Sequence, residues 1–161
     1  MHTTTNRSSV VHNTFSIERT YPSPPSRVFA AFSNQQTKRR WFAEGEGWEV
    51  DEFTLDFRVG GREVSRFRKK GGAPMGNDTV YLDIVSERRI VLAYTMTVGD
   101  KRISVSLATV ELAPSGEGTR LLYTEQGAFF DGADGTKRRE SGCRTLLERL
   151  GEELGKQEQE L

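Results

Sequence analysis

The chain has 161 residues, of which 23 are basic and 23 acidic, so its formal net charge is zero. This length fits one domain, and the balanced charge gives no general attraction to nucleic acid or to an anionic membrane. The longest apolar stretch, around residues 90–94, is far shorter than the roughly 20 residues that cross a bilayer. We therefore expect no nucleic-acid partner and no membrane span.

The N-terminal segment differs in composition from the rest of the chain. Residues 1–12 are rich in Ser, Thr and Asn without apolar periodicity, which predicts a disordered tail. They also lack the apolar core and small-residue cleavage site of a secretory signal, so we expect a cytoplasmic protein. A single domain is predicted over residues 13–157, followed by a short tail at 158–161.

Few residues are suited to bind a metal or a cofactor. The chain has one cysteine, Cys143, and two histidines, His2 and His12, which do not make up a usual zinc ligand set. Gly60-Gly61 lacks the spacing and the following helix of a dinucleotide or phosphate loop. We therefore expect no metal and no cofactor, and we interpret Cys143 as an inert core or cavity-wall residue.

The first elements follow in short order. Alternation of apolar and polar residues over 15–20 predicts a strand, which the prolines at 22, 24 and 25 end. Ser23 or Ser26 is a candidate cap for a helix with a buried stripe of Val28, Phe29 and Phe32. A second short helix is predicted over residues 34–42, ending on Trp41-Phe42.

A long antiparallel run and a closing helix follow. Turn residues separate six predicted strands, at 48–58, 62–70, 78–86, 89–98, 102–112 and 119–127. Apolar residues at helical spacing predict an amphipathic helix over 136–156, with Cys143, Leu146, Leu147, Leu150 and Leu154 on its buried side. We interpret the basic runs 38–40 and 137–139, and Glu153, as solvated surface.

This order of elements predicts an α+β fold. A seven-stranded antiparallel sheet is wide enough to curl, and the apolar side of the C-terminal helix must be covered by it. We expect a helix-grip fold, in which the curved sheet wraps around the long C-terminal helix and two short helices follow the first strand. Such an arrangement tends to leave an internal cavity.

Several segments resemble one known superfamily. They are residues 21–29 (YPSPPSRVF), Trp41-Phe42, 56–61 (DFRVGG), 80–85 (VYLDIV), 89–96 (RIVLAYTM), 118–121 (GTRL) and 123–132 (YTEQGAFFDG). In this order the chain resembles the helix-grip (SRPBCC) superfamily of START lipid-transfer domains, birch-pollen allergens and polyketide cyclases. Within it, the chain is similar to bacterial homologues of the activator of the heat-shock chaperone ATPase. The resemblance implies the fold but does not select one function, because members of the superfamily bind lipids, hormones, polyketides or a chaperone.

Glu125 is the acidic residue most suggestive of a site. On its strand the two-residue period places Leu121, Tyr123 and Glu125 on one face. If this face points into the grip, the carboxylate is either desolvated or held by a cation, and both states suit ligand recognition or proton transfer. A structural acid bonded to an arginine or to backbone N–H groups is the alternative.

Arg66 is the predicted partner for this acid. Val64, Arg66 and Arg68 share one face of their strand, and an inward Arg66 would pair with Glu125 or clamp a ligand carboxylate. The other interpretation is a solvated strand with surface salt bridges, since charges lie on both of its faces.

The residues assigned to a ligand pocket combine apolar bodies with polar or polarizable ends, as small-molecule sites do. They are Trp41, Arg66, Tyr81, Tyr94, Met96, Tyr123, Glu125, Phe129, Leu146 and Leu150. The favoured function is binding of a hydrophobic or amphipathic, lipid-like small molecule without assigned catalysis. The alternatives are a cyclase- or hydrolase-like enzyme using Glu125 as acid or base, and a chaperone-regulating stress protein. The resemblance is also compatible with a homodimer.

Overall fold

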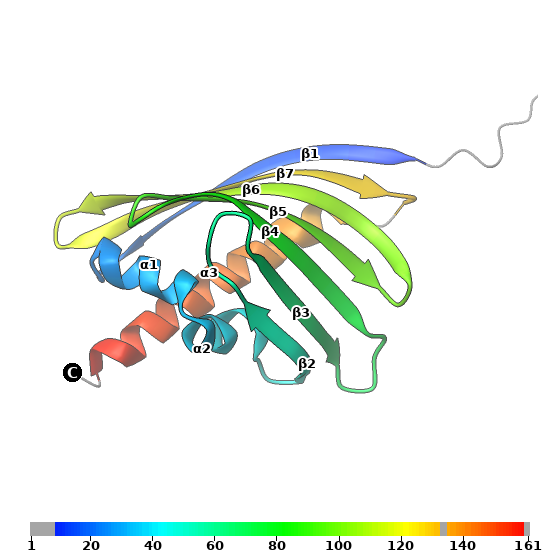
Figure 1. The fold of residues 1–161 in the computed structure, drawn as a ribbon, viewed down its shortest axis with the longest axis horizontal. Coiled ribbons are helices and arrows are strands. Elements are labelled where there is room, and N and C mark those ends of the chain that lie inside the picture. The colour runs from blue at the N-terminus through cyan, green and yellow to red at the C-terminus, as the bar shows by residue number, and fades with distance from the viewer. Residues whose placement is uncertain (1–8, 133–134, 160–161) are drawn as a thin grey trace, which may run out of the picture.

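Seven antiparallel strands form one sheet in the order β1-β7-β6-β5-β4-β3-β2 (Figure 1). The computed structural model describes residues 9–132 and 135–159. The strands are β1 Val10–Tyr21, β2 Trp48–Leu55, β3 Arg62–Lys69, β4 Met75–Val85, β5 Arg89–Val98, β6 Lys101–Ser115 and β7 Gly118–Phe130. The helices are α1 Pro25–Ser33, α2 Gln35–Lys38, the π-helix η1 Arg39–Ala43 and α3 Thr136–Gln159.

The predicted α+β helix-grip architecture is confirmed, with some changes at the boundaries. Strand β1 begins at Val10, which pairs with Phe130 of β7, so residues 10–12 are strand rather than tail. Helix α3 continues to Gln159, past the predicted domain end at 157. The rest of both predicted tails, residues 1–8 and 160–161, lies outside the described residues.

The short helices after β1 differ in detail from their prediction. Pro25 occupies the first position of α1, where its missing N–H is harmless, but the N-cap is Pro24 and makes no side-chain cap bond. The predicted caps Ser23 and Ser26 are therefore wrong. The predicted helix 34–42 divides into α2, capped by Asn34, and the π-helix η1. Short π-helical segments are common at functional sites.

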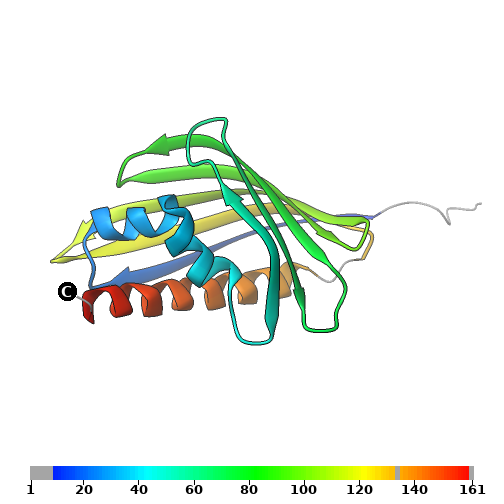
Figure 2. The same cartoon turned by 60° about the horizontal axis from the view of Figure 1, so that its bottom comes forward.

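Helix α3 lies on the concave side of the sheet and runs along β1 (Figures 1 and 2). Its residues Leu147, Leu150 and Leu154 are buried, and the Tyr21 hydroxyl of β1 donates to the Leu147 carbonyl at 2.7 Å. Each leucine removed from water stabilises the fold by about 1.5–3 kcal/mol. The apolar side of α3 therefore holds it in the grip.

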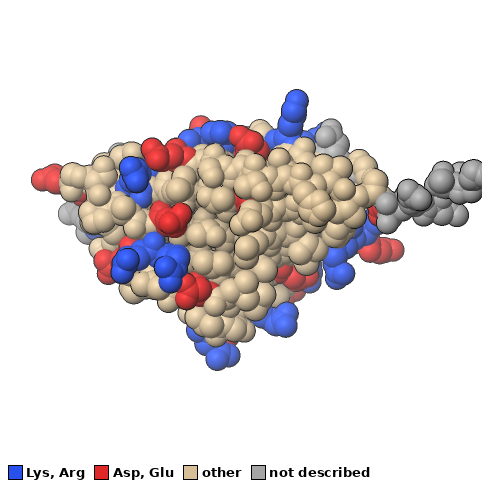
Figure 3. Space-filling model, turned by 90° about the horizontal axis from the view of Figure 1, so that it is seen from above, with Lys and Arg blue, Asp and Glu red and all other residues tan. Residues whose placement is uncertain are grey.

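The two faces of the sheet differ in polarity. Concave-face residues such as Ile17, Ile90 and Val110 are almost fully buried in the core. On the convex face, Val105 and Leu107 of β6 keep 39% and 36% of their surface exposed. Figure 3 shows this face with broad areas that carry no charged side chain.

Candidate functional site

The carboxylate of Glu125 lies at the centre of a buried hydrogen-bonded network. Glu125 is on the concave face of β7 and has no exposed surface, and it shares that face with Leu121 and Tyr123, as the two-residue period predicted. The hydroxyl of Tyr94 on β5 lies 2.8 Å from both carboxylate oxygens and donates to them. The hydroxyl of Tyr123 donates to Oε1 at 2.5 Å. A carboxylate removed from water needs such donors, because an unpaired buried charge is strongly unfavourable.

Arg139 of α3 supplies the positive charge of this network. Its Nη1 lies 3.1 Å from Glu125 Oε2 and donates to the Tyr94 oxygen at 2.9 Å. The same guanidinium donates to Ser104 at 2.7 Å and to Ser106 at 3.3 Å, both on β6. With only 11% of its side chain exposed, Arg139 joins α3 to three strands. We call these five residues, together with Tyr123 and Cys143, the Glu125 network.

Cys143 borders the network without a reactive environment. Its Sγ lies 3.6 Å from Glu125 Oε1 and 3.8 Å from the Tyr123 oxygen. Burial, and next the negative charge of Glu125, raise the pKa of the thiol to about 12. A nucleophilic cysteine needs a lowered pKa, so the structure agrees with an inert wall residue.

Burial shifts the acid–base behaviour of the neighbouring groups. It raises the pKa of Tyr94 well above the usual tyrosine value, and the charge of Glu125 adds to the effect. The pKa of Tyr123 is raised mainly by burial too, with smaller contributions from Cys143 and Tyr94. Burial alone lowers the pKa of Arg139, but Tyr94 and Glu125 raise it and the net direction is upward. The tyrosines are therefore neutral donors at ordinary pH, and Arg139 is charged.

We predict that alkali unfolds the protein in one step and titrates all four tyrosines with it. Burial also raises the pKa of Tyr21 and Tyr81, so every tyrosine of the chain is shifted upward. A group whose pKa is higher in the folded state than in the unfolded state stabilises the fold. This stabilisation is fully present below the pKa of the unfolded state, which is 9 for Cys143 and 10 for tyrosine, and it is lost as the pH rises through the pKa of the folded state.

This prediction is checked by following tyrosinate absorbance near 295 nm and circular dichroism during one alkaline titration. We expect both signals to change together. A tyrosine that titrates near its ordinary pKa while the circular dichroism is still native would contradict the prediction.

Phe129 covers the guanidinium of Arg139, and two glycines make room for its ring. The Arg139 Cζ lies 5.1 Å from the Phe129 ring centre and 5.4 Å from that of Tyr94, within range of cation–π attraction. A Cβ added at Gly127 would lie 2.9 Å from the Phe129 ring, and one at Gly135 would lie 2.5 Å from it. The small residues therefore permit the packing of Phe129 over Arg139.

We predict that Gly127→Ala destabilises the protein by about 1–3 kcal/mol, the usual effect of overpacking. The new methyl would crowd Phe129 and would lie 3.0 Å from Ser106 Oγ. Gly142→Ala on α3 is the matched control, because a Cβ there meets nothing within 4 Å and alanine favours a helix by about 0.5–1 kcal/mol. Urea denaturation of both variants is the measurement, and equal stability changes would refute the crowding argument.

A second buried ion pair lies on the same concave face. Lys38 Nζ of α2 is 2.6 Å from Glu63 Oε1 of β3, and their side chains are 6% and 2% exposed. The Tyr81 hydroxyl donates to the same oxygen at 2.6 Å, and the ammonium lies 4.7 Å from the Phe42 ring centre. We call Lys38, Glu63 and Tyr81 the Lys38 cluster. It ties α2 to β3 and β4.

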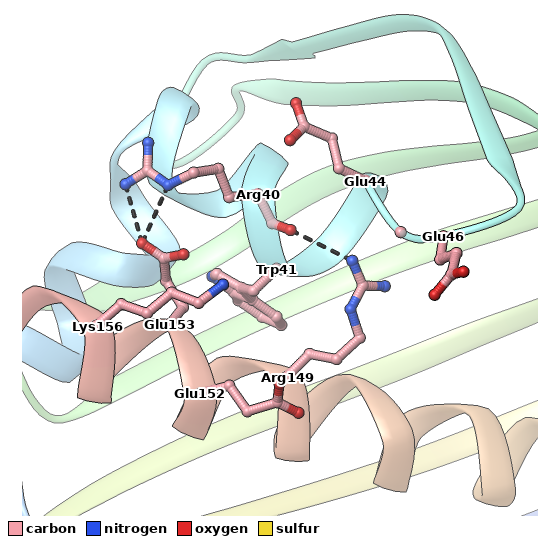
Figure 4. A pocket seen from close by; sticks show the side chains of 9 residues that line it. Arg40, Trp41, Glu44, Glu46, Arg149, Glu152, Glu153 and Lys156 are labelled. Carbon is pink, nitrogen blue, oxygen red and sulfur yellow. Dashed lines mark hydrogen bonds and ion pairs between the residues drawn. The ribbon is translucent and has the colours of Figure 1, made fainter.

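A polar groove of about 440 Å³ lies between η1 and α3, on the outside of the grip (Figure 4). Arg40 donates to Glu153 at 3.0 and 2.9 Å on one side of it. Arg149 lies flat against Gly45 and donates to the Arg40 carbonyl at 3.2 Å. Both acidic and basic side chains line this groove, which favours neither an anion nor a cation.

The predicted site residues fall into separate places. Four of them meet around Arg139: Tyr94, Tyr123, Glu125 and Phe129. Tyr81 belongs to the Lys38 cluster, and Trp41 is a buried residue whose indole donates to the Ala31 carbonyl at 2.9 Å and whose edge borders the groove. Leu150 is fully buried in the core, whereas Met96 on β5 and Leu146 on α3 are half-buried.

The predicted inward position of Arg66 is wrong. Its Nη2 pairs with Asp78 Oδ1 at 2.9 Å, and both side chains are more than 40% exposed. On β3 the concave face carries Glu63, Ser65 and Phe67 instead, and Arg66 alternates with them on the convex face. The surface salt bridge, the other interpretation of this strand, is what the structure shows.

Two basic residues that were interpreted as solvated point inward instead, Lys38 buried and Arg139 with 11% of its side chain exposed. The sequence interpretation missed this part of the site. Arg139 stands four residues before Cys143, so it continues the i, i+4 stripe of α3, a signal that was present in the sequence. Lys38 lies in a four-residue helix, too short for its periodicity to show which side is buried. Glu153, predicted to be wet, is 7% exposed because it pairs with Arg40.

Comparison with known proteins identifies the family. Residues 22–155 match the family model described as activator of Hsp90 ATPase homolog 1-like protein. The chain belongs to this family. No curated protein matches the chain.

Solved structures agree with this assignment. The Mll3558 protein of Rhizobium loti is 57% identical, with 90% of this chain and 99% of that one covered and a TM-score of 0.84. An uncharacterized protein of Rhizobium leguminosarum is 38% identical over 94% of this chain and 99% of that one, with a TM-score of 0.90. CV1439 of Chromobacterium violaceum is 27% identical over 86% and 94%, with a TM-score of 0.72.

The family membership supports a ligand-binding type of fold. Within the described residues, no three His, Cys, Asp or Glu side chains gather as around a metal ion. None of the helices in the described part of the chain is both long and apolar enough to span a membrane.

Proposed function

We propose that the protein binds an amphipathic small molecule on the concave face of its sheet, between β3–β6 and α3. The observation that carries this proposal is the mixed character of that face. The hydrogen-bonded ion pair Glu125–Arg139 lies on the same concave side as inward-facing apolar side chains that keep accessible surface, namely Phe67, Leu92, Met96 and Leu146. Small-molecule sites combine apolar walls with a few fixed polar groups in this way.

The network is suited to recognition more than to proton transfer. Glu125 accepts from Tyr94, Tyr123 and Arg139, and a proton transfer would require one of these bonds to break. The hydroxyls and the guanidinium are already held in place, so little conformational entropy of these side chains is lost when a ligand bonds to their outer edges. Glu125 itself then acts as a positioning residue for Tyr94 and Arg139.

Native mass spectrometry of the purified protein, followed by denaturing extraction, tests this proposal. We expect a stoichiometric adduct in the native spectrum and one released amphipathic compound in the extract. The same spectrum reports whether the predicted homodimer forms.

Arg139→Lys is the variant for the same measurement, because a lysine keeps the charge but loses the planar fork that spans three strands. We expect it to lose the adduct. An adduct that persists unchanged in Arg139→Lys, or a bare protein mass together with no compound that binds on screening, would contradict the proposal.

A further inference from the structure

Ser65 is a buried polar residue on the concave face of β3. It is 1% exposed, and its Oγ has no hydrogen-bond partner among the residues that the structure describes. Its side chain shares the concave face of β3 with Glu63, because the two are separated by one residue. A buried hydroxyl left unbonded is unfavourable, so such a group calls for a partner that comes from elsewhere.

The strand register places Ser65 at one end of a row of opposed residues that crosses the sheet. Ser65 is opposite Asn77 of β4, which is opposite Met96 of β5, which is opposite Ser104 of β6. Ser104 is the residue to which Arg139 donates at 2.7 Å. Three strand spacings of about 4.8 Å separate Ser65 from Ser104, a span of about 14 Å. The unbonded hydroxyl and the Glu125 network thus face the same concave surface.

Half-buried apolar side chains border this row on the open side of the grip. Phe67 and Met75 precede and follow the β3–β4 turn, and Met96 and Val98 stand before the β5–β6 turn. All four keep part of their surface accessible although they belong to the concave-face series of their strands. In Figure 2 these two turns lie at the end of the sheet that is farther from α1. These side chains offer an apolar molecule contacts beside the row.

The charges of the concave face are balanced. Glu125 is paired with Arg139, and Glu63 is paired with Lys38, at 3.1 and 2.6 Å. The side chains between these two pairs, Asn77, Thr79 and Ser65 among them, are uncharged. A ligand with a net charge would be desolvated there without a counter-ion, which is strongly unfavourable.

From this geometry we propose that the ligand is an uncharged molecule with two hydrogen-bonding groups. One group meets the Glu125 network, and the other, a hydroxyl, carbonyl or amide, bonds to Ser65 Oγ beside Asn77. This inference rests on the proposed function and names the class of molecule for the same face. Ser65 is then a specificity-determining residue at the β3–β4 end of the site.

Displacement of the neutral dye N-phenyl-1-naphthylamine tests the inference with defined probes. Decane-1,10-diol, 1-decanol and decanoate share one chain length and differ in their polar ends. For the native chain we expect decanoate to displace the dye at least tenfold more weakly than 1-decanol. In Ser65→Ala we expect the Kd of the diol to rise about fivefold, the value of one net hydrogen bond, with the Kd of 1-decanol unchanged.

Ser65→Ala removes an unbonded hydroxyl, so its melting temperature should not fall, which separates a binding effect from misfolding. Ser16→Ala is the matched control, because that hydroxyl lies on the convex face and bonds to Thr124. A diol Kd that stays the same in Ser65→Ala, or decanoate binding as tight as that of 1-decanol, would overturn the inference and leave the proposed function standing. If the native chain binds neither the dye nor any probe, both are rejected.

Discussion

Replacing Lys38 by methionine is expected to destabilise the protein by about 3–5 kcal/mol. The substitution leaves the Glu63 carboxylate, 2% exposed, without its cation. Stranding one member of a buried ion pair has an effect of this size because the remaining charge stays desolvated. Glu63 keeps the Tyr81 hydroxyl as a donor, and methionine keeps an apolar contact with Phe42. The loss of stability should therefore lie near the lower end of this range, at about 3 kcal/mol. Urea denaturation gives the free energy of unfolding.

The double variant Lys38→Met, Glu63→Gln separates the charge from the packing. Its amide oxygen can still accept from Tyr81, and no charge is left buried, so most of the lost stability should return. Arg89→Met is the control, since its partner Asp83 is 44% exposed and a surface pair contributes at most about 1 kcal/mol. A double variant as unstable as the single one would show that the buried charge of Glu63 is not the cause of the lost stability.

Local patterns made the fold predictable. Alternation along β5, with Ile90 and Tyr94 on one face, and the leucine stripe of α3 both survive as buried faces in the structure. Each pattern depends only on the period of a strand or helix, so it can be recognised without knowing the neighbours. The same period placed Tyr123 and Glu125 together on one face, and the structure shows that this face is the concave one.

The partners of Glu125 were harder to predict because pairing across a sheet depends on register. Arg66 was the predicted cation, whereas Arg139 was interpreted as solvated, but it is α3 that carries an arginine over β7. The rule that runs of charge are solvated misassigned Arg139 and Lys38, since one member of a charged run can point inward while its neighbours remain wet. The inward carboxylates, Glu63 and Glu125, are what made these two cations stable inside.

Replacing Arg139 by methionine is the second change with a large expected effect, again about 3–5 kcal/mol. Glu125 would lose its only cation within the described residues and has no exposed surface with which to reach water. Ser104 and Ser106 would lose their donor, and the Tyr94 and Phe129 rings would lose the guanidinium between them. Tyr94→Phe should be milder, at about 1–2 kcal/mol, because it removes one hydroxyl but keeps the ion pair.

A double-mutant cycle with Glu125→Gln measures how strongly the pair is coupled. If the two charges support each other, Glu125→Gln and Arg139→Met together should destabilise less than the sum of the single changes, by about 1–3 kcal/mol. Chemical denaturation of the four proteins supplies every leg of the cycle. Strict additivity would mean that Arg139 stabilises the protein through its contacts with Ser104 and Phe129 alone, and that Glu125 is held by its two tyrosines.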